Sequence, residues 1–193
     1  MKKSIVISII FLILGISIGI YNAVDKFYKQ KEEETKIISF FNSEINGIEP
    51  KELNKKNKYN YIAVLEIPSI DLKNGLVSKT DISNNVNENI TILPESVMPD
   101  EEGYFILAAH SGTADISYFK NLNKLSLNDY IYVYYKNTKY IYKVNNFYEE
   151  EKGIITINNN SDKDKAIVLT TCKPITDDKQ ITYVAHLEGK SSY

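Results

Sequence analysis

The segment Ala166-Ile167-Val168-Leu169-Thr170-Thr171-Cys172 decides how the rest of the chain is interpreted. Its aliphatic and β-branched run predicts a short buried strand. Lys173-Pro174 follows at once, and because proline lacks a backbone N–H and disfavours helix in the residue before it, the strand is expected to end there. The strand therefore presents the only cysteine of the chain at its end. Most free cysteines are small buried hydrophobes, so a reactive role needs a second feature.

That second feature is the segment Tyr104-Phe105-Ile106-Leu107-Ala108-Ala109-His110, which is continuously apolar and ends on a histidine. Such a run predicts a strand buried on both faces. An imidazole close to a thiol can take its proton and convert it to the thiolate nucleophile. Cys172 and His110 are therefore a candidate nucleophile and acid–base pair. The other histidine, His186, lies late in an alternating strand pattern, which favours a core role.

Composition limits the possible functions. The chain has 193 residues, 43% of them hydrophobic and 25% charged, which suits one globular domain with a smaller appendage. A net charge of −2 provides no basic field for nucleic acid. One cysteine excludes an internal disulfide and a thiolate-cluster metal site, and two histidines leave little for zinc. We therefore predict no metal and no nucleic-acid partner.

Calcium is a weaker hypothesis. Five glutamates, Glu101, Glu102, Glu149, Glu150 and Glu151, fall in segments expected to be loops, and calcium takes six or more oxygen ligands. A solvated acidic loop is the favoured interpretation of these residues.

The N-terminus predicts a membrane anchor. Residues 1–3 are a short basic start, and residues 4–21 are almost unbroken aliphatic and aromatic, long enough to cross about 30 Å of hydrocarbon as a helix. A cleavable signal peptide is the alternative, but its apolar region is shorter, and Tyr21-Asn22-Ala23 is a poor cleavage site. Lys2 and Lys3 favour a cytoplasmic N-terminus. We expect a single-pass cell-membrane protein with its remainder extracytoplasmic.

The rest of the chain divides into a linker and a domain. Residues 22–60 are expected to be an extracytoplasmic linker whose first half continues as helix to about Phe41, with an apolar stripe that packs on the protein's own domain. Residues 51–58 read as a solvated tether. Residues 61–193 alternate short strand patterns with turns, which predicts a closed or sandwiched all-β domain.

These features together resemble the sortases, the membrane-anchored cysteine transpeptidases of Gram-positive bacteria. The likeness spans about residues 61–187, with its motifs in order, and the sortase class, A-like or D-like, stays open. Val168-Leu169-Thr170-Thr171-Cys172 matches the Thr-Leu-x-Thr-Cys signature, with Val168 in place of its first Thr. Phe105 to Gly112 resembles the strand and turn that carry the histidine. Phe119 to Asp129 resembles the helix and turn that follow, and Leu65 to Leu72 resembles the opening hairpin.

The resemblance implies a sortase-like eight-stranded β-barrel with short helices. It also implies that the Cys172 thiolate attacks a Leu-Pro-x-Thr-Gly-like sorting signal of a surface protein between Thr and Gly. His110 would protonate the leaving amine and later deprotonate the incoming one. The acceptor would be the amine of a peptidoglycan precursor or of a pilin lysine. Thr171, beside the nucleophile, is expected to contact substrate.

One departure from the family concerns arginine. Sortases keep an arginine on the strand after the cysteine loop, whereas all 23 basic residues of this chain are lysines. Alignment puts Gln180 in that place, with Lys179 beside it. Either side chain can donate to an oxyanion, and strand alternation points Gln180 into the site and Lys179 away from it.

Three functional interpretations remain open from the sequence: a transpeptidase, a non-catalytic sortase-like domain that binds sorting signals or scaffolds other surface proteins, and a thiol hydrolase that cleaves without transfer.

Overall fold

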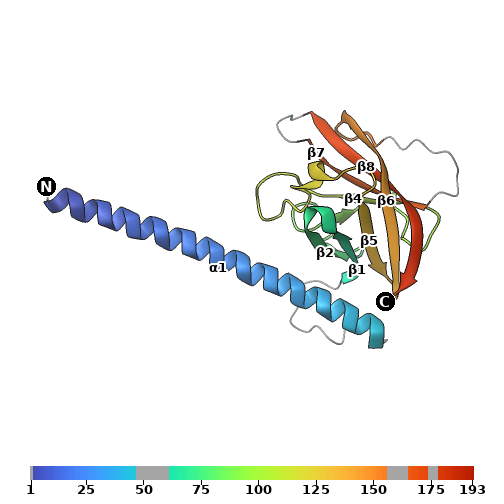
Figure 1. The fold of residues 1–193 in the computed structure, drawn as a ribbon, viewed down its shortest axis with the longest axis horizontal. Helices are drawn as coiled ribbons and strands as arrows, with labels where there is room; N and C mark the ends of the chain where they lie inside the picture. Colours follow the sequence, from blue (N-terminus) through green and yellow to red (C-terminus); the bar gives the residue numbers. More distant parts are fainter. Residues whose placement is uncertain (1, 47–60, 156–164, 174–177) are drawn as a thin grey trace.

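The computed structural model describes residues 2–46, 61–155, 165–173 and 178–193. A long helix lies beside a strongly curved sheet (Figure 1). The elements are α1 (Lys2–Asn46), β1 (Tyr61–Ile67), η1 (Pro68–Ile70), β2 (Leu72–Val77), β3 (Thr91–Ile92), β4 (Gly103–Ala108), η2 (Leu122–Lys124), β5 (Tyr130–Tyr135), β6 (Thr138–Glu151), β7 (Lys165–Cys172) and β8 (Lys179–Ser192).

The eight strands form one sheet in the order β2-β1-β5-β6-β8-β7-β4-β3. Neighbouring strands are antiparallel except β4 and β7, which are parallel. The two strands at the ends of this order, β2 and β3, contact each other, so the sheet curls into a nearly closed barrel. The predicted all-β, eight-stranded barrel behind an N-terminal helix is confirmed.

The barrel interior is filled by alternate residues of the strands, as the two-residue period of a strand requires. In β7, Ile167 and Leu169 belong to the main core, together with Phe105 and Leu107 of β4. The residues between them point to the outer face of the barrel, where Val168 joins a separate apolar cluster. β4 and β7 are therefore buried on both faces, which explains their continuously apolar sequences.

Two segments differ from the sequence-based expectation. The glutamates Glu149, Glu150 and Glu151 belong to strand β6 rather than to a loop, because β8 pairs with β6 along their whole length. The helix expected within Phe119 to Asp129 is present only as turns and the short 3₁₀ helix η2. In both places, pairing and turn geometry override local preference.

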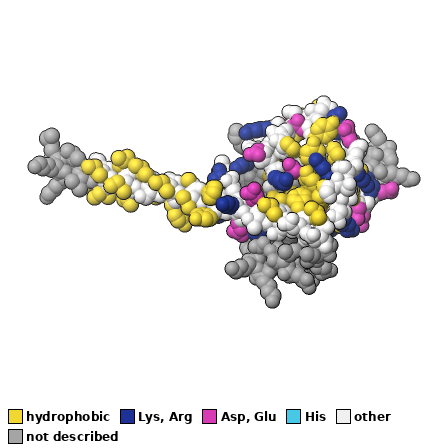
Figure 2. Space-filling view, turned by 60° about the horizontal axis from the view of Figure 1, so that its bottom comes forward, with side chains coloured by type: hydrophobic (Ala, Val, Ile, Leu, Met, Phe, Trp, Pro, Cys, Tyr) yellow, Lys and Arg dark blue, Asp and Glu magenta, His cyan; other side chains and the backbone are white. Residues whose placement is uncertain are grey.

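Helix α1 also runs further than expected. It continues without a break from the apolar N-terminal segment to Asn46, five residues beyond the expected end at Phe41, and residues 47–60 lie outside the described part. Ile37 and Phe40 are buried against Tyr61, Val64 and Val77 of the barrel. Within the described residues, α1 is the only helix long and apolar enough to cross a membrane. Figure 2 shows hydrophobic side chains along its projecting part and lysines where it reaches the barrel.

The contact between α1 and the barrel leads to a prediction on stability. A Cβ atom at Gly75 would lie 2.0 Å from Cδ2 of Tyr61, whose ring is buried and whose hydroxyl is bonded to Glu33. We expect Gly75→Ala to lower the free energy of unfolding by about 1–3 kcal/mol, the usual cost of overpacking. The control is Gly189→Ala, where a Cβ meets nothing within 4 Å. Equal melting of both variants by circular dichroism would contradict this packing.

Candidate active site

His110, Cys172 and Gln180 come together at one end of the barrel. β4 and β7 run in parallel register up to the pair Ala108–Thr170. The N–H of Ala109 then donates to the carbonyl of Thr170 at 3.4 Å, which keeps the chains side by side where His110 and Cys172 follow. On the other side of β7, Cys172 pairs directly with Gln180 of β8. We call these three residues the site row.

The site row lies on the outer face of the barrel. Because side chains alternate along a strand, Cys172 shares the face of Thr170 and Val168, whereas Leu169 points into the core. The row next to it contains Ala108 of β4, Thr170 of β7 and Thr182 of β8. The hydroxyl oxygens of Thr170 and Thr182 are 3.2 Å apart and hydrogen-bonded.

Thr171 takes a different place from the one predicted. It was expected to contact substrate, but alternation turns it to the face opposite Cys172, and it is buried. Its hydroxyl donates to the carbonyl of Ala109 at 2.6 Å. Thr171 therefore ties the end of β7 to the residue before His110, so it positions the site row and does not face it.

His110 is held by side-chain and backbone contacts. Its Nε2 is 3.2 Å from Oδ1 of Asn87, and its carbonyl accepts a hydrogen bond of 3.0 Å from the N–H of Phe119. Sequence reasoning missed Asn87, which lies 23 residues earlier in an Asn-rich segment without a periodic signal. The other histidine, His186, pairs with Ala166, six residues before Cys172, so it lies about 20 Å away along the strand.

Gln180 is buried, and both ends of its amide are engaged. Its Oε1 accepts a hydrogen bond of 3.0 Å from the N–H of Gly153, and its Nε2 donates to the carbonyl of Ile154. The side chain therefore fixes the first residues after β6 beside the site row. An amide nitrogen carries two N–H groups, so one donor remains beyond the bond to Ile154. Lys179 is exposed, and its carbonyl accepts the N–H of Lys173 at 2.9 Å.

The residue after the cysteine is fixed as well. The ammonium of Lys173 forms an ion pair with Glu149 of β6. This hydrogen bond, with a smaller contribution from charge attraction, holds the pKa of the Glu149 carboxyl below its usual value. Because Lys173 bonds to Lys179 through its backbone and to Glu149 through its side chain, the chain leaving Cys172 is tied to both β8 and β6.

An apolar cluster lies on the same outer face, beyond the row of Ala108, Thr170 and Thr182. Its buried members are Ile106, Ala166, Val168 and Val184. The row of Ile106, Val168 and Val184 lies four residues from the site row, about 13 Å along the strands. Partly buried side chains pack against the cluster from both sides: Leu93, Tyr104, Tyr148 and Ile155.

The described residues hold no group of three His, Cys, Asp or Glu side chains suited to a metal ion. In particular, Oε2 of Glu101 accepts the N–H of Met98, and Glu149 is paired with Lys173. A cleft of about 780 Å³ lies elsewhere, between α1 and the barrel, and no member of the site row lines it.

Comparison with known proteins identifies the family. The family model described as Sortase domain matches residues 65–188. The chain therefore belongs to the sortase family, whose members are generally cysteine transpeptidases. A search of curated proteins finds no significant match.

Solved sortases share the fold. Sortase A of Listeria monocytogenes is 24% identical, with a TM-score of 0.58 over 69% of this chain and 90% of that one. A sortase D5 transpeptidase of Clostridium perfringens is 20% identical, with a TM-score of 0.63 over 82% and 99%. Sortase C of the same organism, solved with its C-terminal cell wall sorting motif, is 22% identical, with a TM-score of 0.58 over 84% and 90%.

Proposed function

We propose that this chain is a membrane-anchored cysteine transpeptidase that cleaves a Leu-Pro-x-Thr-Gly-like sorting signal of surface proteins. It then joins the new carboxyl group of the threonine, at the end of the acyl fragment, to an amine of a cell-wall precursor or a pilin. The observation that carries this proposal is the site row, in which the ends of three adjacent strands bring a thiol, an imidazole and an amide onto one face. The apolar N-terminal part of α1 supplies the anchor, with the barrel outside the cell.

The chemistry follows from these three groups. The Cys172 thiolate attacks the threonine carbonyl carbon, and the C–N bond to glycine breaks as His110 gives a proton to the leaving amine. The product is a thioester. An acceptor amine then attacks the same carbon, His110 takes its proton, and the thiolate leaves. Gln180 offers an N–H to the oxyanion that forms in each step.

The substrate class is supported by the surroundings of the site row. The apolar cluster lies about 13 Å along the strands from Cys172, and an extended peptide covers about 10 Å between the Leu and the Thr of such a signal. An aliphatic side chain three residues before that threonine therefore extends toward the cluster. The sortase C structure, which contains a sorting motif, supports the same class of substrate by analogy.

The experiment is incubation of the protein with a Leu-Pro-x-Thr-Gly peptide in the presence and absence of an added amine, with the products identified by mass spectrometry. A transpeptidase gives the amide of the acyl fragment with the amine. Free acid in both reactions would indicate the thiol hydrolase. Peptide binding without cleavage would indicate the non-catalytic sortase-like domain.

The missing arginine gives a separate prediction. We expect Gln180→Ala to lower the acylation rate by about 10²-fold, because it removes an oxyanion donor. Gln180→Glu keeps an oxygen for the N–H of Gly153 but loses the amide donors, so it should be equally slow. Lys179→Ala should change the rate little, because Lys179 is exposed and on the other face.

Single-turnover kinetics with the same peptide measure the acylation rate of each variant. If Gln180→Glu acylates at the wild-type rate, Gln180 acts by accepting the N–H of Gly153 and not as an oxyanion donor. If Lys179→Ala is the slow variant, lysine is the substitute for arginine.

A further inference from the structure

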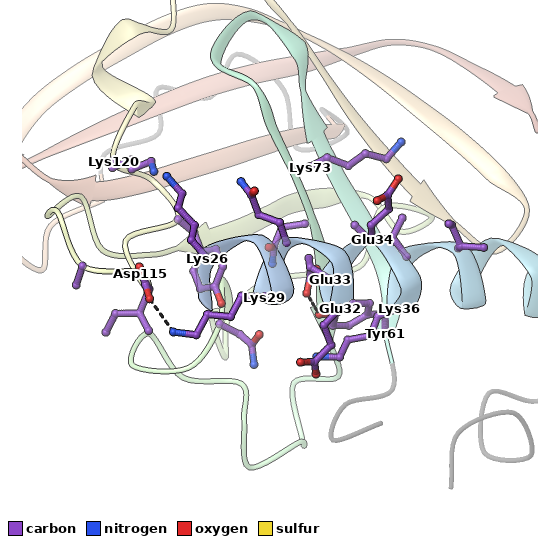
Figure 3. Close-up of a pocket in the computed structure, with 18 of the residues that line it drawn as sticks. Lys26, Lys29, Glu32, Glu33, Glu34, Lys36, Tyr61, Lys73, Asp115 and Lys120 are labelled. Carbon is purple, nitrogen blue, oxygen red and sulfur yellow. Dashed lines mark hydrogen bonds and ion pairs between the residues drawn. The ribbon is translucent and has the colours of Figure 1, made fainter. Parts of the chain in front are cut away.

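Helix α1 is docked on the barrel between Lys29 and Glu44. At one end, Nζ of Lys29 forms an ion pair of 2.8 Å with Asp115, five residues after His110 (Figure 3). At the other end, Glu44 accepts hydrogen bonds from the backbone N–H of Asn137 and from the hydroxyl of Tyr193 at 3.0 Å. The fifteen residues from Lys29 to Glu44 cover about 22 Å of helix axis.

Between these ends, Glu33 fixes the helix to the barrel. Its two carboxylate oxygens accept hydrogen bonds from the hydroxyl of Tyr61 at 2.5 Å and from the N–H of Gly75 at 3.0 Å. Further along, the ring of Phe41 packs edge-on against Tyr134 and Tyr193, with centroids 5.1 and 5.2 Å away. Sliding the helix by one turn would break all of these contacts, so its position along the barrel is defined.

The docking also has a direction. Cys172 pairs with Gln180 at the start of β8, whereas Thr138, next to Asn137, pairs with Ser192 at the end of β8. Asn137 and Tyr193 therefore mark the end of the barrel opposite the site row, and Asp115 lies beyond the end of β4 from which His110 extends. Since Asp115 contacts the more N-terminal part of α1, the site end of the barrel faces the apolar segment.

The site end is also close to that segment. Lys29 follows Tyr21, the last residue of the apolar segment, by eight residues, which is about 12 Å of helix. A headgroup layer is about 5–8 Å thick, so Lys29 lies only a few ångströms beyond it, about 4–7 Å. Lys26, Lys29 and Lys120 line the cleft of about 780 Å³ that opens here beside Asp115 (Figure 3). Lys29 is paired with Asp25 and Asp115, so the attraction to anionic lipid headgroups at a nearby bilayer surface comes from Lys26 and Lys120.

We propose that the docked helix holds the site end of the barrel against the headgroup layer of the membrane, with residues 113–120 facing the lipid. This inference rests on the proposed membrane anchor. A substrate held at the bilayer surface meets the site row without crossing the height of the barrel.

The test uses the full chain in vesicles of phosphatidylcholine and phosphatidylglycerol. Cys172→Ser removes the only thiol, and Ala114→Cys or Ser191→Cys, both at exposed positions, then accepts a fluorophore. Lipids with a nitroxide on the headgroup are the quencher. We expect strong quenching at residue 114 and little at residue 191. Equal quenching, or stronger quenching at residue 191, would overturn the proposal.

A pair of helix variants tests whether the docking of α1 sets the orientation of the barrel. Glu33→Ala removes both hydrogen bonds to the barrel and should reduce the difference in quenching between the two labels. Glu32→Ala is the matched control, because Glu32 pairs with Lys36 within the helix, and it should leave the difference unchanged. An unchanged difference in Glu33→Ala, with the fold intact by circular dichroism, would show that docking does not set the orientation. No peptide is used, so these results are independent of whether the protein is a transpeptidase.

Discussion

Replacement of Cys172 by alanine is expected to abolish turnover of a sorting-signal peptide and to leave the barrel folded. The chain has no other thiol, so no second residue can form the thioester. Cys172 is only partly buried at the end of β7, and its side chain is small, so the loss of packing is minor. Peptide cleavage measured by chromatography and thermal unfolding measured by circular dichroism check the two halves of this prediction.

The matched variant for this test is Cys172→Ser, which keeps the size of the side chain and replaces the thiol with a weaker nucleophile. It should be as inactive as the alanine variant. Cleavage at the wild-type rate in either variant would exclude Cys172 as the nucleophile and, with it, the thioester mechanism.

Replacement of His110 by alanine is the second change with a large expected effect. Removal of a general acid–base group slows a reaction by about 10²–10⁴-fold, and we expect a loss of that size in kcat. The histidine on β8 provides the control, because His186 pairs with Ala166 about 20 Å from Cys172. His186→Ala should keep the wild-type rate. If the two histidine variants are equally active, neither imidazole takes part in the proton transfers.

The two strands that carry Cys172 and His110 could be predicted from sequence because both are buried on two faces. Burial on both faces leaves continuous apolar runs, and such runs are a local signal that a single sequence displays. The ends of the runs also indicated the candidate site, because a cysteine and a histidine stand where the chain leaves the sheet. The parallel register that places them side by side is a non-local property and appears only in the structure.

The contacts of Gln180 could not be predicted. Gly153 and Ile154 lie 27 and 26 residues earlier in the chain, and nothing in their sequence indicates that they meet the amide. Thr171 shows that sequence-based prediction is limited even for a residue next to the candidate nucleophile. Its position beside Cys172 suggested contact with substrate, but two neighbours on a strand face opposite sides, so adjacency in sequence separates them in the site.

The packing of helix α1 on the barrel could be predicted from the sequence, but the direction of its docking could not. The apolar stripe with Ile37 and Phe40 predicted packing on the barrel, and these residues are buried there. The end of the helix was expected at about Phe41, whereas the helix continues to Asn46. The direction of docking depends on pairs such as Lys29 with Asp115, 86 residues apart, which no local pattern encodes.

The central claim, that Cys172 forms a thioester with a sorting signal, is tested most directly by the intact mass of the wild-type protein. The protein is mixed with excess Leu-Pro-x-Thr-Gly peptide, quenched in acid within the first turnover, and weighed by mass spectrometry. We predict an added mass equal to the fragment that ends in threonine, located on Cys172 by digestion and released by hydroxylamine. An unchanged mass while cleavage proceeds, or an adduct on any other residue, would contradict the mechanism.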